Sequence, residues 1–104
     1  MQNKVKDFNA KKDCHLKPMP PYARLLDIES EIGELAKEYL KGSKYGTKEF
    51  ELKDDFLLEF GDVLYSLLSL ANELEIDAEK ALNLVIEKYK LRIESNGDMG
   101  SKKE

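Results

Sequence analysis

Two pairs of acidic residues with the same spacing stand out in this chain of 104 residues: Glu31-x-x-Glu34 in SEIGELAKE and Glu59-x-x-Asp62 in EFGDVL. Residues three apart are neighbours on a helix surface, where like charges repel each other by about a few tenths of a kcal/mol. Neither Glu59 nor Asp62 has a lysine or arginine three or four residues away. The four carboxylates are therefore candidates for a role that needs clustered negative charge.

The position of these acids relative to the apolar residues favours a metal site. Glu59 borders the apolar side of its helix next to Val63, and Glu31 borders Leu35 in the same way. A carboxylate at the edge of a core is costly unless a cation meets it. If the two helices pack antiparallel, four carboxylates converge, and such oxygen ligands suit Mg²⁺ or Mn²⁺ better than Zn²⁺. The alternative is a pair of solvated helix faces, since Asp and Glu together number 21.

Composition narrows the class of protein. Hydrophobic residues make up 41% of the chain and charged residues 37%, a balance typical of a highly charged helical protein. The net charge of −4 shows no basic surplus, so we expect no nucleic-acid partner. No apolar run is long enough to span a membrane, and the first residues lack the apolar segment of a signal peptide. Cys14 is the single cysteine and cannot form an internal disulfide, so we expect a cytoplasmic protein.

The hydrophobic periodicity is helical throughout and predicts an all-α fold. It predicts helices over about residues 2–12, 21–41, 51–73 and 78–95. Three prolines in CHLKPMPP break the chain before the second helix, Gly42 suits its C-cap, and Asp77 suits the N-cap of the last helix. We expect a single domain over residues 1–104, with core helices over about 20–95 and a flexible tail over 96–104.

The apolar sides of the two long helices are wider than one partner helix covers. On a helical wheel, the apolar side chains of the predicted helix over residues 51–73 span an arc of roughly 160°. Four short helices cannot bury two such surfaces within one chain. The sequence therefore predicts a four-helix bundle-like arrangement that is completed by homo-oligomerisation.

Three segments, two of which contain the acid pairs, resemble the MazG-like nucleotide pyrophosphohydrolases of the all-α NTP pyrophosphatase superfamily. The segments are LLDIESEIGELAKEYL, EFGDVLYSLLSLANELEID and EKYKLRIESNGDMGS. The family pattern is Glu-x-x-Glu, a spacer, and Glu-x-x-Asp. Here Glu31, Glu34, Glu59 and Asp62 supply it, with the 24 residues 35–58 between the pairs. Ser30 departs from the pattern, because many members have a second glutamate there.

The resemblance implies a MazG fold, a homodimer or homotetramer, and Mg²⁺-dependent hydrolysis of nucleoside triphosphates to a nucleoside monophosphate and pyrophosphate. It implies that Glu31, Glu34, Glu59 and Asp62 are both the metal ligands and the catalytic residues. Nucleotide-pool house-cleaning is the role expected for such an activity, and the sequence does not distinguish the clearing of damaged nucleotides from the tuning of nucleotide pools. The resemblance does not indicate which base or sugar is preferred, how many ions bind, or whether the α or the β phosphorus is attacked.

Basic and aromatic residues are candidates for contacts to the substrate. Lys88 and Arg92 share a face of the last predicted helix, and the resemblance places basic residues of this helix near the phosphates. The alternative for this pair is an ordinary solvated face. Tyr45, in the loop KYGTK, could stack on a base, although a loop tyrosine is more often only a surface residue. Cys14 and His15 have no partners that suggest a zinc site or a nucleophile.

Two other functions are compatible with the same sequence. One is a base-selective dUTP- or dCTP-type pyrophosphatase, because base selection depends on the shape of a pocket. The other is a non-catalytic helical dimerisation module that presents an acidic face to a basic partner. Glu29 interrupts the apolar side of its helix, and the sequence gives no account of it beyond a place at a subunit edge.

Overall fold

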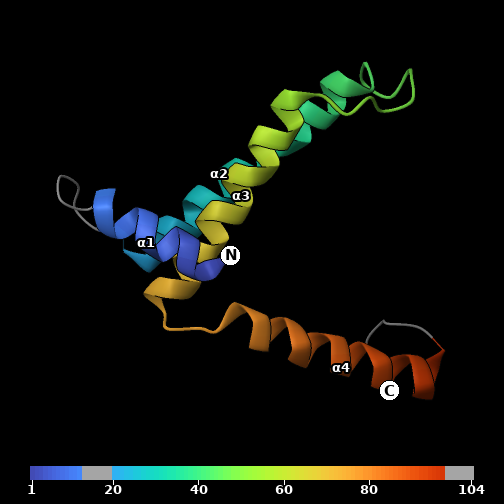
Figure 1. Cartoon of the computed structure of the whole chain (residues 1–104). Coiled ribbons are helices and arrows are strands. Elements are labelled where there is room, and N and C mark those ends of the chain that lie inside the picture. The colour runs from blue at the N-terminus through green and yellow to red at the C-terminus, as the bar shows by residue number, and fades with distance from the viewer. Residues whose placement is uncertain (13–19, 98–104) are drawn as a thin grey trace.

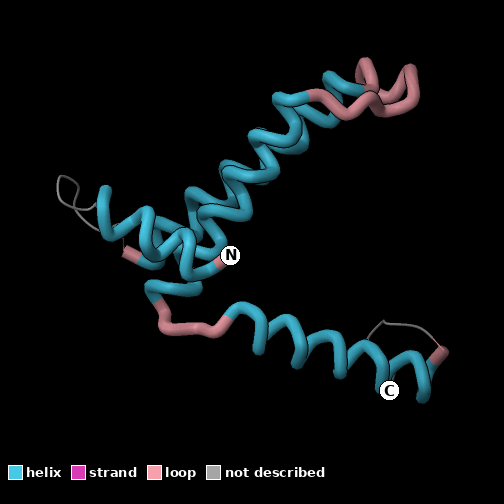
Figure 2. Tube along the Cα trace, viewed as in Figure 1, coloured by secondary structure: helices cyan, strands magenta, loops and turns pink. Residues whose placement is uncertain are grey.

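The computed structural model describes residues 1–12 and 20–97. Those residues form four α-helices and no strand, which confirms the predicted all-α class (Figures 1 and 2). The helices are α1 (Gln2–Lys12), α2 (Pro21–Gly42), α3 (Asp54–Glu73) and α4 (Ala78–Asn96). Cys14, His15 and Pro18, and the tail from residue 98 onward, lie outside these ranges, so the predictions made for them do too.

Helices α2 and α3 form an antiparallel hairpin, in which both lie side by side along their length (Figure 1). At one end, Arg24 near the start of α2 forms an ion pair with Glu73 at the end of α3, with 3.3 Å between Nη2 and Oε1. At the other end, the ring of Tyr39 meets that of Phe56 at a centroid distance of 6.4 Å. The hairpin buries Ile28, Leu68, Leu70 and Ala71, which form the apolar core of the described residues.

The connection between α2 and α3 is held by an aromatic group. The ring of Phe50 stacks on Tyr39 at a centroid distance of 4.4 Å and an interplanar angle of 8°. It also meets the edge of Phe56 at 5.0 Å. This packing keeps the residues before Asp54 extended, with Lys53 at φ −119° and ψ 164° as the N-cap. Helix α3 therefore begins at Asp54, three residues after the predicted start.

Helix α1 packs on the second half of α3. The ring of Phe8 meets the edge of Tyr65 at a centroid distance of 6.0 Å. Asn9 connects the helices through polar contacts, since its Nδ2 donates to Ser69 Oγ at 3.1 Å and its Oδ1 accepts from the Tyr65 hydroxyl. Ser69 is almost completely buried, so these hydrogen bonds satisfy polar groups that water does not reach.

Helix α4 turns away from the hairpin, and no other described helix packs along it (Figure 1). The radius of gyration of 17.4 Å exceeds the value of about 13 Å for a compact chain of this length. Apolar side chains on both sides of α4 are between 41% and 64% exposed: Leu82, Leu84, Ile86, Leu91 and Ile93. Among the described helices, none has the length and apolar character needed to cross a membrane.

Candidate active site

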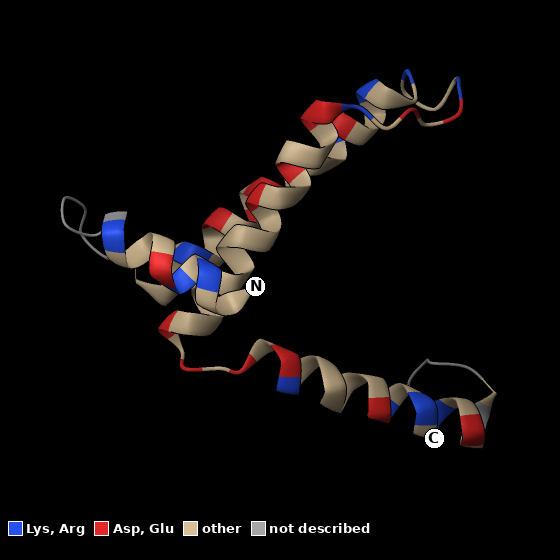
Figure 3. Ribbon diagram, in the orientation of Figure 1, with Lys and Arg blue, Asp and Glu red and all other residues tan. Residues whose placement is uncertain are grey.

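Three of the four predicted carboxylates come together on one side of the α2–α3 hairpin. Glu31 from α2 and Glu59 and Asp62 from α3 each offer an oxygen atom, and these atoms all lie within 4.8 Å of one another. The antiparallel packing places the middle of α2 opposite the middle of α3, and the three-residue spacing keeps Glu59 and Asp62 on one face. Acidic segments run along both helices of the hairpin (Figure 3). The triad Glu31, Glu59 and Asp62 is the first element of the candidate site.

The Glu31 carboxyl group lies in an unfavourable electrostatic environment for a negative charge. Partial burial is the largest cause that raises its pKa above the ordinary value of 4.5, and the charge of Asp62 is the next. Asp27, Glu59 and Glu34 raise this pKa further. The ionised form is therefore disfavoured, first by partial burial and then by the acids on both helices.

Glu59 faces the same repulsion from the opposite helix. Partial burial raises its pKa above 4.5, followed by the charges of Asp62, Glu34, Glu38 and Asp55. None of the ion pairs found among the described residues includes a member of the triad. A cation bound between the carboxylates would remove this repulsion, so the electrostatics fit a metal site.

Glu34 lies near the triad without joining it. Its charge acts on both Glu31 and Glu59, but its carboxylate belongs to an exposed ion pair, with 3.6 Å between Glu34 Oε1 and Lys37 Nζ. An exposed pair of this kind is worth little free energy, so Glu34 can leave it at small cost. The structure thus brings together three of the four predicted ligands and leaves the fourth one helical turn away.

The acidic field extends beyond the four predicted ligands. Asp27 acts on Glu31, and Asp55 acts on Glu59, each from one helical turn before the residue it affects. Glu38 also acts on Glu59 and forms an ion pair with Lys41, with 3.3 Å between Oε1 and Nζ. The sequence signal for Asp27 and Asp55 is their i, i+4 spacing to a predicted ligand.

The predicted phosphate-binding residues lie on α4, away from the triad. Lys88 Nζ lies 5.4 Å from the centroid of the Tyr89 ring, and Arg92 Cζ lies 6.0 Å from the same centroid. Because α4 does not pack against the hairpin, a single chain does not bring these basic groups against the acids. Tyr45 is 73% exposed in the α2–α3 loop, and its backbone has a φ of 57°, in the left-handed region.

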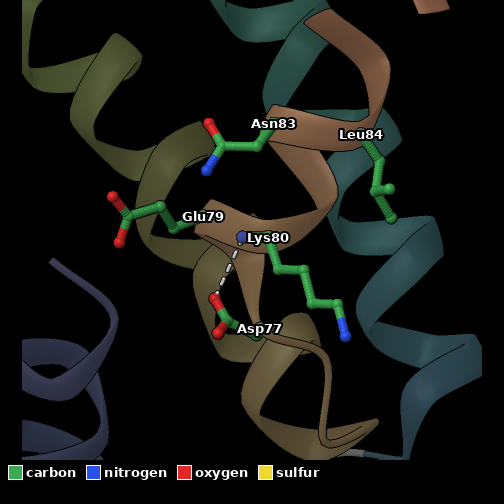
Figure 4. A pocket seen from close by; sticks show the side chains of 5 residues that line it. All are labelled: Asp77, Glu79, Lys80, Asn83 and Leu84. Carbon is green, nitrogen blue, oxygen red and sulfur yellow. Dashed lines mark hydrogen bonds between the residues drawn. The ribbon is translucent and has the colours of Figure 1, made fainter. Parts of the chain in front are cut away.

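Two hollows lie near the start of α4 and apart from the triad. The smaller, of about 320 Å³, is lined by Asp77, Glu79, Lys80, Asn83 and Leu84 (Figure 4). The larger, of about 860 Å³, lies between α1, the end of α3 and the start of α4. Neither hollow is lined by a triad residue, and side chains from the first turns of α4 line part of both.

Comparisons with known proteins agree with the geometry. Residues 22–95 match the MazG nucleotide pyrophosphohydrolase domain, a stretch that includes the hairpin and nearly all of α4. The chain is 35% identical over 96 residues to the uncharacterized protein YpjD of Bacillus subtilis (strain 168), with 85% of each chain covered. No solved structure matches it significantly. With three acids of the expected pattern on facing helices of an all-α fold, this chain belongs to the MazG nucleotide pyrophosphohydrolase family.

Proposed function

We propose that this protein hydrolyses nucleoside triphosphates to a nucleoside monophosphate and pyrophosphate in a reaction that depends on a divalent cation. The observation that carries the proposal is the triad of Glu31, Glu59 and Asp62, whose oxygen atoms lie within 4.8 Å of one another. Acids from two helices repel one another at this point, and a bound cation would offset that repulsion.

The donor set of the triad fits Mg²⁺, with Mn²⁺ as the alternative ion. All three side chains offer hard oxygen ligands, and Glu34 one turn away can add a fourth. When bound, the ion supplies charge neutralisation at the phosphate oxygens of the substrate. Three or four carboxylates leave coordination positions for water and phosphate, as a catalytic site requires.

The residues of the chain then have separate tasks in the reaction. The triad carboxylates would hold the cation, and Glu31, Glu34 or Glu59 would accept a proton from the attacking water. The oxygen of that water forms a bond to phosphorus, and the bond between the α and β phosphates breaks. Attack at the α or the β phosphorus gives the same two products, a nucleoside monophosphate and pyrophosphate.

We propose further that the site is completed by a second copy of the chain, as a homodimer or homotetramer. Leu84, Lys88 and Leu91 are spaced i, i+4 and i+7, so they share one face of α4. A partner that covers the two leucines therefore also lies against Lys88. The basic Lys88 and Arg92 are complementary in charge to the acidic side of the hairpin, and Tyr45 is exposed in the loop that joins α2 and α3. In this arrangement the basic residues of one chain hold the phosphates beside the acids of another.

A panel of canonical and modified nucleoside triphosphates tests the proposed reaction. Each is incubated with the protein and Mg²⁺, Mn²⁺ or a chelator, and monophosphate and pyrophosphate are measured as products. We expect cation-dependent release of both products in equal amounts. Activity confined to dUTP or dCTP would identify a base-selective enzyme, and preference for modified bases would support a house-cleaning role. No turnover of any nucleotide would favour a non-catalytic dimerisation module.

A further inference from the structure

The N-terminus of α4 is held by a residue at the other end of the sequence. Ala78 N, the first amide of α4, donates to Gln2 Oε1 on α1 at 2.9 Å. Gln2 Nε2 donates to Ile76 O at 2.5 Å, and Asn72 Nδ2 on α3 donates to Gln2 O at 3.2 Å. The side-chain amide of Gln2 thus connects both sides of Asp77, in the turn between α3 and α4.

These contacts satisfy backbone groups that the turn leaves without partners. The first amides of a helix lack acceptors within the helix. The Asp77 side chain accepts from Lys80 N at 3.1 Å, as Figure 4 shows, and Gln2 accepts from Ala78 N. On the other side of Asp77, Ile76 N donates to Ala71 O at 2.8 Å, and Ile76 O accepts from Gln2 Nε2. Two side chains therefore share the capping of α4, and one of them comes from α1.

The direction of α4 depends on this turn. No other described helix packs along α4, so helix packing within the chain does not orient it. The turn itself includes Glu75 at a φ of 55°, a left-handed conformation that is unfavourable for a residue with a side chain. A short turn with a strained residue needs contacts from other segments to keep one conformation. The hydrogen bonds of Gln2 to Ile76 and Ala78, and of Asn72 to Gln2, supply such contacts.

We infer that Gln2 is a positioning residue, which fixes the direction of α4 and thereby the place where Lys88 and Arg92 meet the substrate. The effect on substrate rests on the function proposed above, whereas the effect on the direction of α4 does not. Gln2 lies at the turn rather than at the acidic triad, so it acts through α4 and not on the reacting atoms. Helix α1 then has a role in substrate binding although it carries none of the predicted site residues.

Asn9 provides a matched control for the loss of an amide side chain from α1. Asn9 holds α1 on α3 through Ser69 and Tyr65 and has no hydrogen bond to the turn. Asn9→Ala should therefore weaken the attachment of α1 without directly freeing α4. Gln2→Glu is an intermediate variant, because its carboxylate still accepts from Ala78 N but no longer donates to Ile76 O.

The first experiment measures the direction of α4 without reference to activity. Spin labels are placed at Glu29→Cys on α2 and Lys90→Cys on α4, both exposed, in a Cys14→Ser background. Labelled full-length protein is diluted with unlabelled protein, and the distance between labels is measured by pulsed electron paramagnetic resonance. We expect Gln2→Ala to broaden or shift the distance distribution, Gln2→Glu to do so less, and Asn9→Ala to leave it unchanged. An unchanged distribution for Gln2→Ala in a folded protein overturns the inference, whatever the enzyme assays show.

The second experiment measures substrate binding through a double-mutant cycle. We expect Gln2→Ala to raise KM by roughly three- to tenfold with kcat little changed, as the loss of one or two hydrogen bonds predicts. Combined with Lys88→Ala/Arg92→Ala, it should raise KM little beyond that of the Lys88→Ala/Arg92→Ala variant, because both contacts that α4 is proposed to supply are then already lost. Additive effects, or a Gln2→Ala variant with unchanged KM, would show that Gln2 does not position Lys88. If the unsubstituted protein turns over no nucleotide, the proposed function fails, and the distance measurement alone decides whether Gln2 orients α4.

Discussion

Asp62 on α3 and Glu31 on α2 place carboxylate oxygens within 4.8 Å of each other across the hairpin. The pKa of Glu31 is raised by partial burial and then by the charge of Asp62, so the metal-free protein holds this pair at a cost in stability. A cation held between the two carboxylates would offset this repulsion. The pair therefore connects the energetics of the hairpin with the reaction proposed for it.

Removing one carboxylate of the triad should abolish activity without unfolding the protein. We expect Glu59→Gln or Asp62→Asn to lower kcat/KM by about two orders of magnitude or more, because several kcal/mol of charge stabilisation depend on the cation. The same changes relieve repulsion within the triad, so the melting temperature without metal should stay the same or rise. Steady-state kinetics and thermal melts with a chelator measure the two effects.

Glu29→Gln is the matched control for these substitutions. Glu29 is exposed on α2 and lies two residues before Glu31, so it points to a different side of the helix, about 200° away. We expect its variant to keep full activity. If Glu59→Gln retains full activity, or loses it only because the protein unfolds, the assignment of the triad is wrong.

The stability of the metal-free protein should fall as the pH rises above the ordinary pKa of these acids. The pKa values of Glu31 and Glu59 are raised above 4.5, so the folded state binds more protons than the unfolded state just above that pH. Their contribution to stability is fully present below pH 4.5 and is lost as the pH passes the raised pKa values. Urea unfolding with a chelator, at fixed protein concentration, measures this slope. Glu31→Gln should flatten it, and Mg²⁺ should reverse it, because the cation favours the ionised carboxylates.

Gly42→Ala should destabilise the end of the hairpin. A Cβ atom at this position would lie 2.8 Å from Phe50 Cε1 and 3.0 Å from Glu51 O, closer than van der Waals contact allows. The ring of Phe50 would have to leave its stacked position on Tyr39. We expect a loss of about 1 to 3 kcal/mol in the free energy of unfolding, measured by urea denaturation. Gly33→Ala is the control, since a Cβ atom there meets nothing within 4 Å.

Local signals predicted the helices well. Pro21 marks the start of α2, and Asp77 caps α4 as expected, because both effects depend on neighbouring residues alone. The start of α3 was predicted three residues early, since the stacking of Phe50 on Tyr39 is a contact between segments eleven residues apart. Such a contact leaves no periodic pattern in the sequence.

The same contrast between local signals and contacts of distant segments applies to the candidate site. The i, i+3 spacing identifies Glu59 and Asp62 as neighbours, and antiparallel packing brings Glu31 to them. Glu34 lies outside the triad and forms only a weak, exposed ion pair with Lys37, which stands three residues later. The contacts of Gln2 with the turn before α4 join residues more than seventy positions apart, and nothing in the composition of α1 predicts them.

Self-association should be measurable at micromolar concentrations. Leu84 and Leu91 are 64% and 58% exposed on one face of α4, and a single chain leaves them in water. We expect sedimentation equilibrium to show a dimer or a tetramer. Leu84→Glu should weaken the association, whereas Lys90→Glu, also an exposed change on α4, should affect it less. A stable monomer under these conditions would contradict the prediction.

Two inactive variants should restore activity to each other if the site lies between chains. Lys88→Ala should mainly raise KM, because Lys88 is expected to hold phosphate in the ground state and the transition state alike. The double variant Lys88→Ala/Arg92→Ala should have little activity at low substrate concentration. Glu59→Gln should also have little activity, because it lacks a proposed cation ligand. In a dimer whose sites combine the acids of one chain with α4 of the other, a mixed pair contains one intact site.

Equal amounts of the Glu59→Gln chain and the Lys88→Ala/Arg92→Ala chain are mixed, dissociated and reassociated before the assay. Random pairing into dimers makes half of them mixed, so about a quarter of the unsubstituted activity should return. Reassociating each variant with itself is the control and should restore nothing. If the mixture stays inactive although sedimentation shows mixed oligomers, the acids and basic residues of one site belong to the same chain. Helix α4 would then have to fold back onto its own hairpin, and the proposed contribution of a second copy would be wrong.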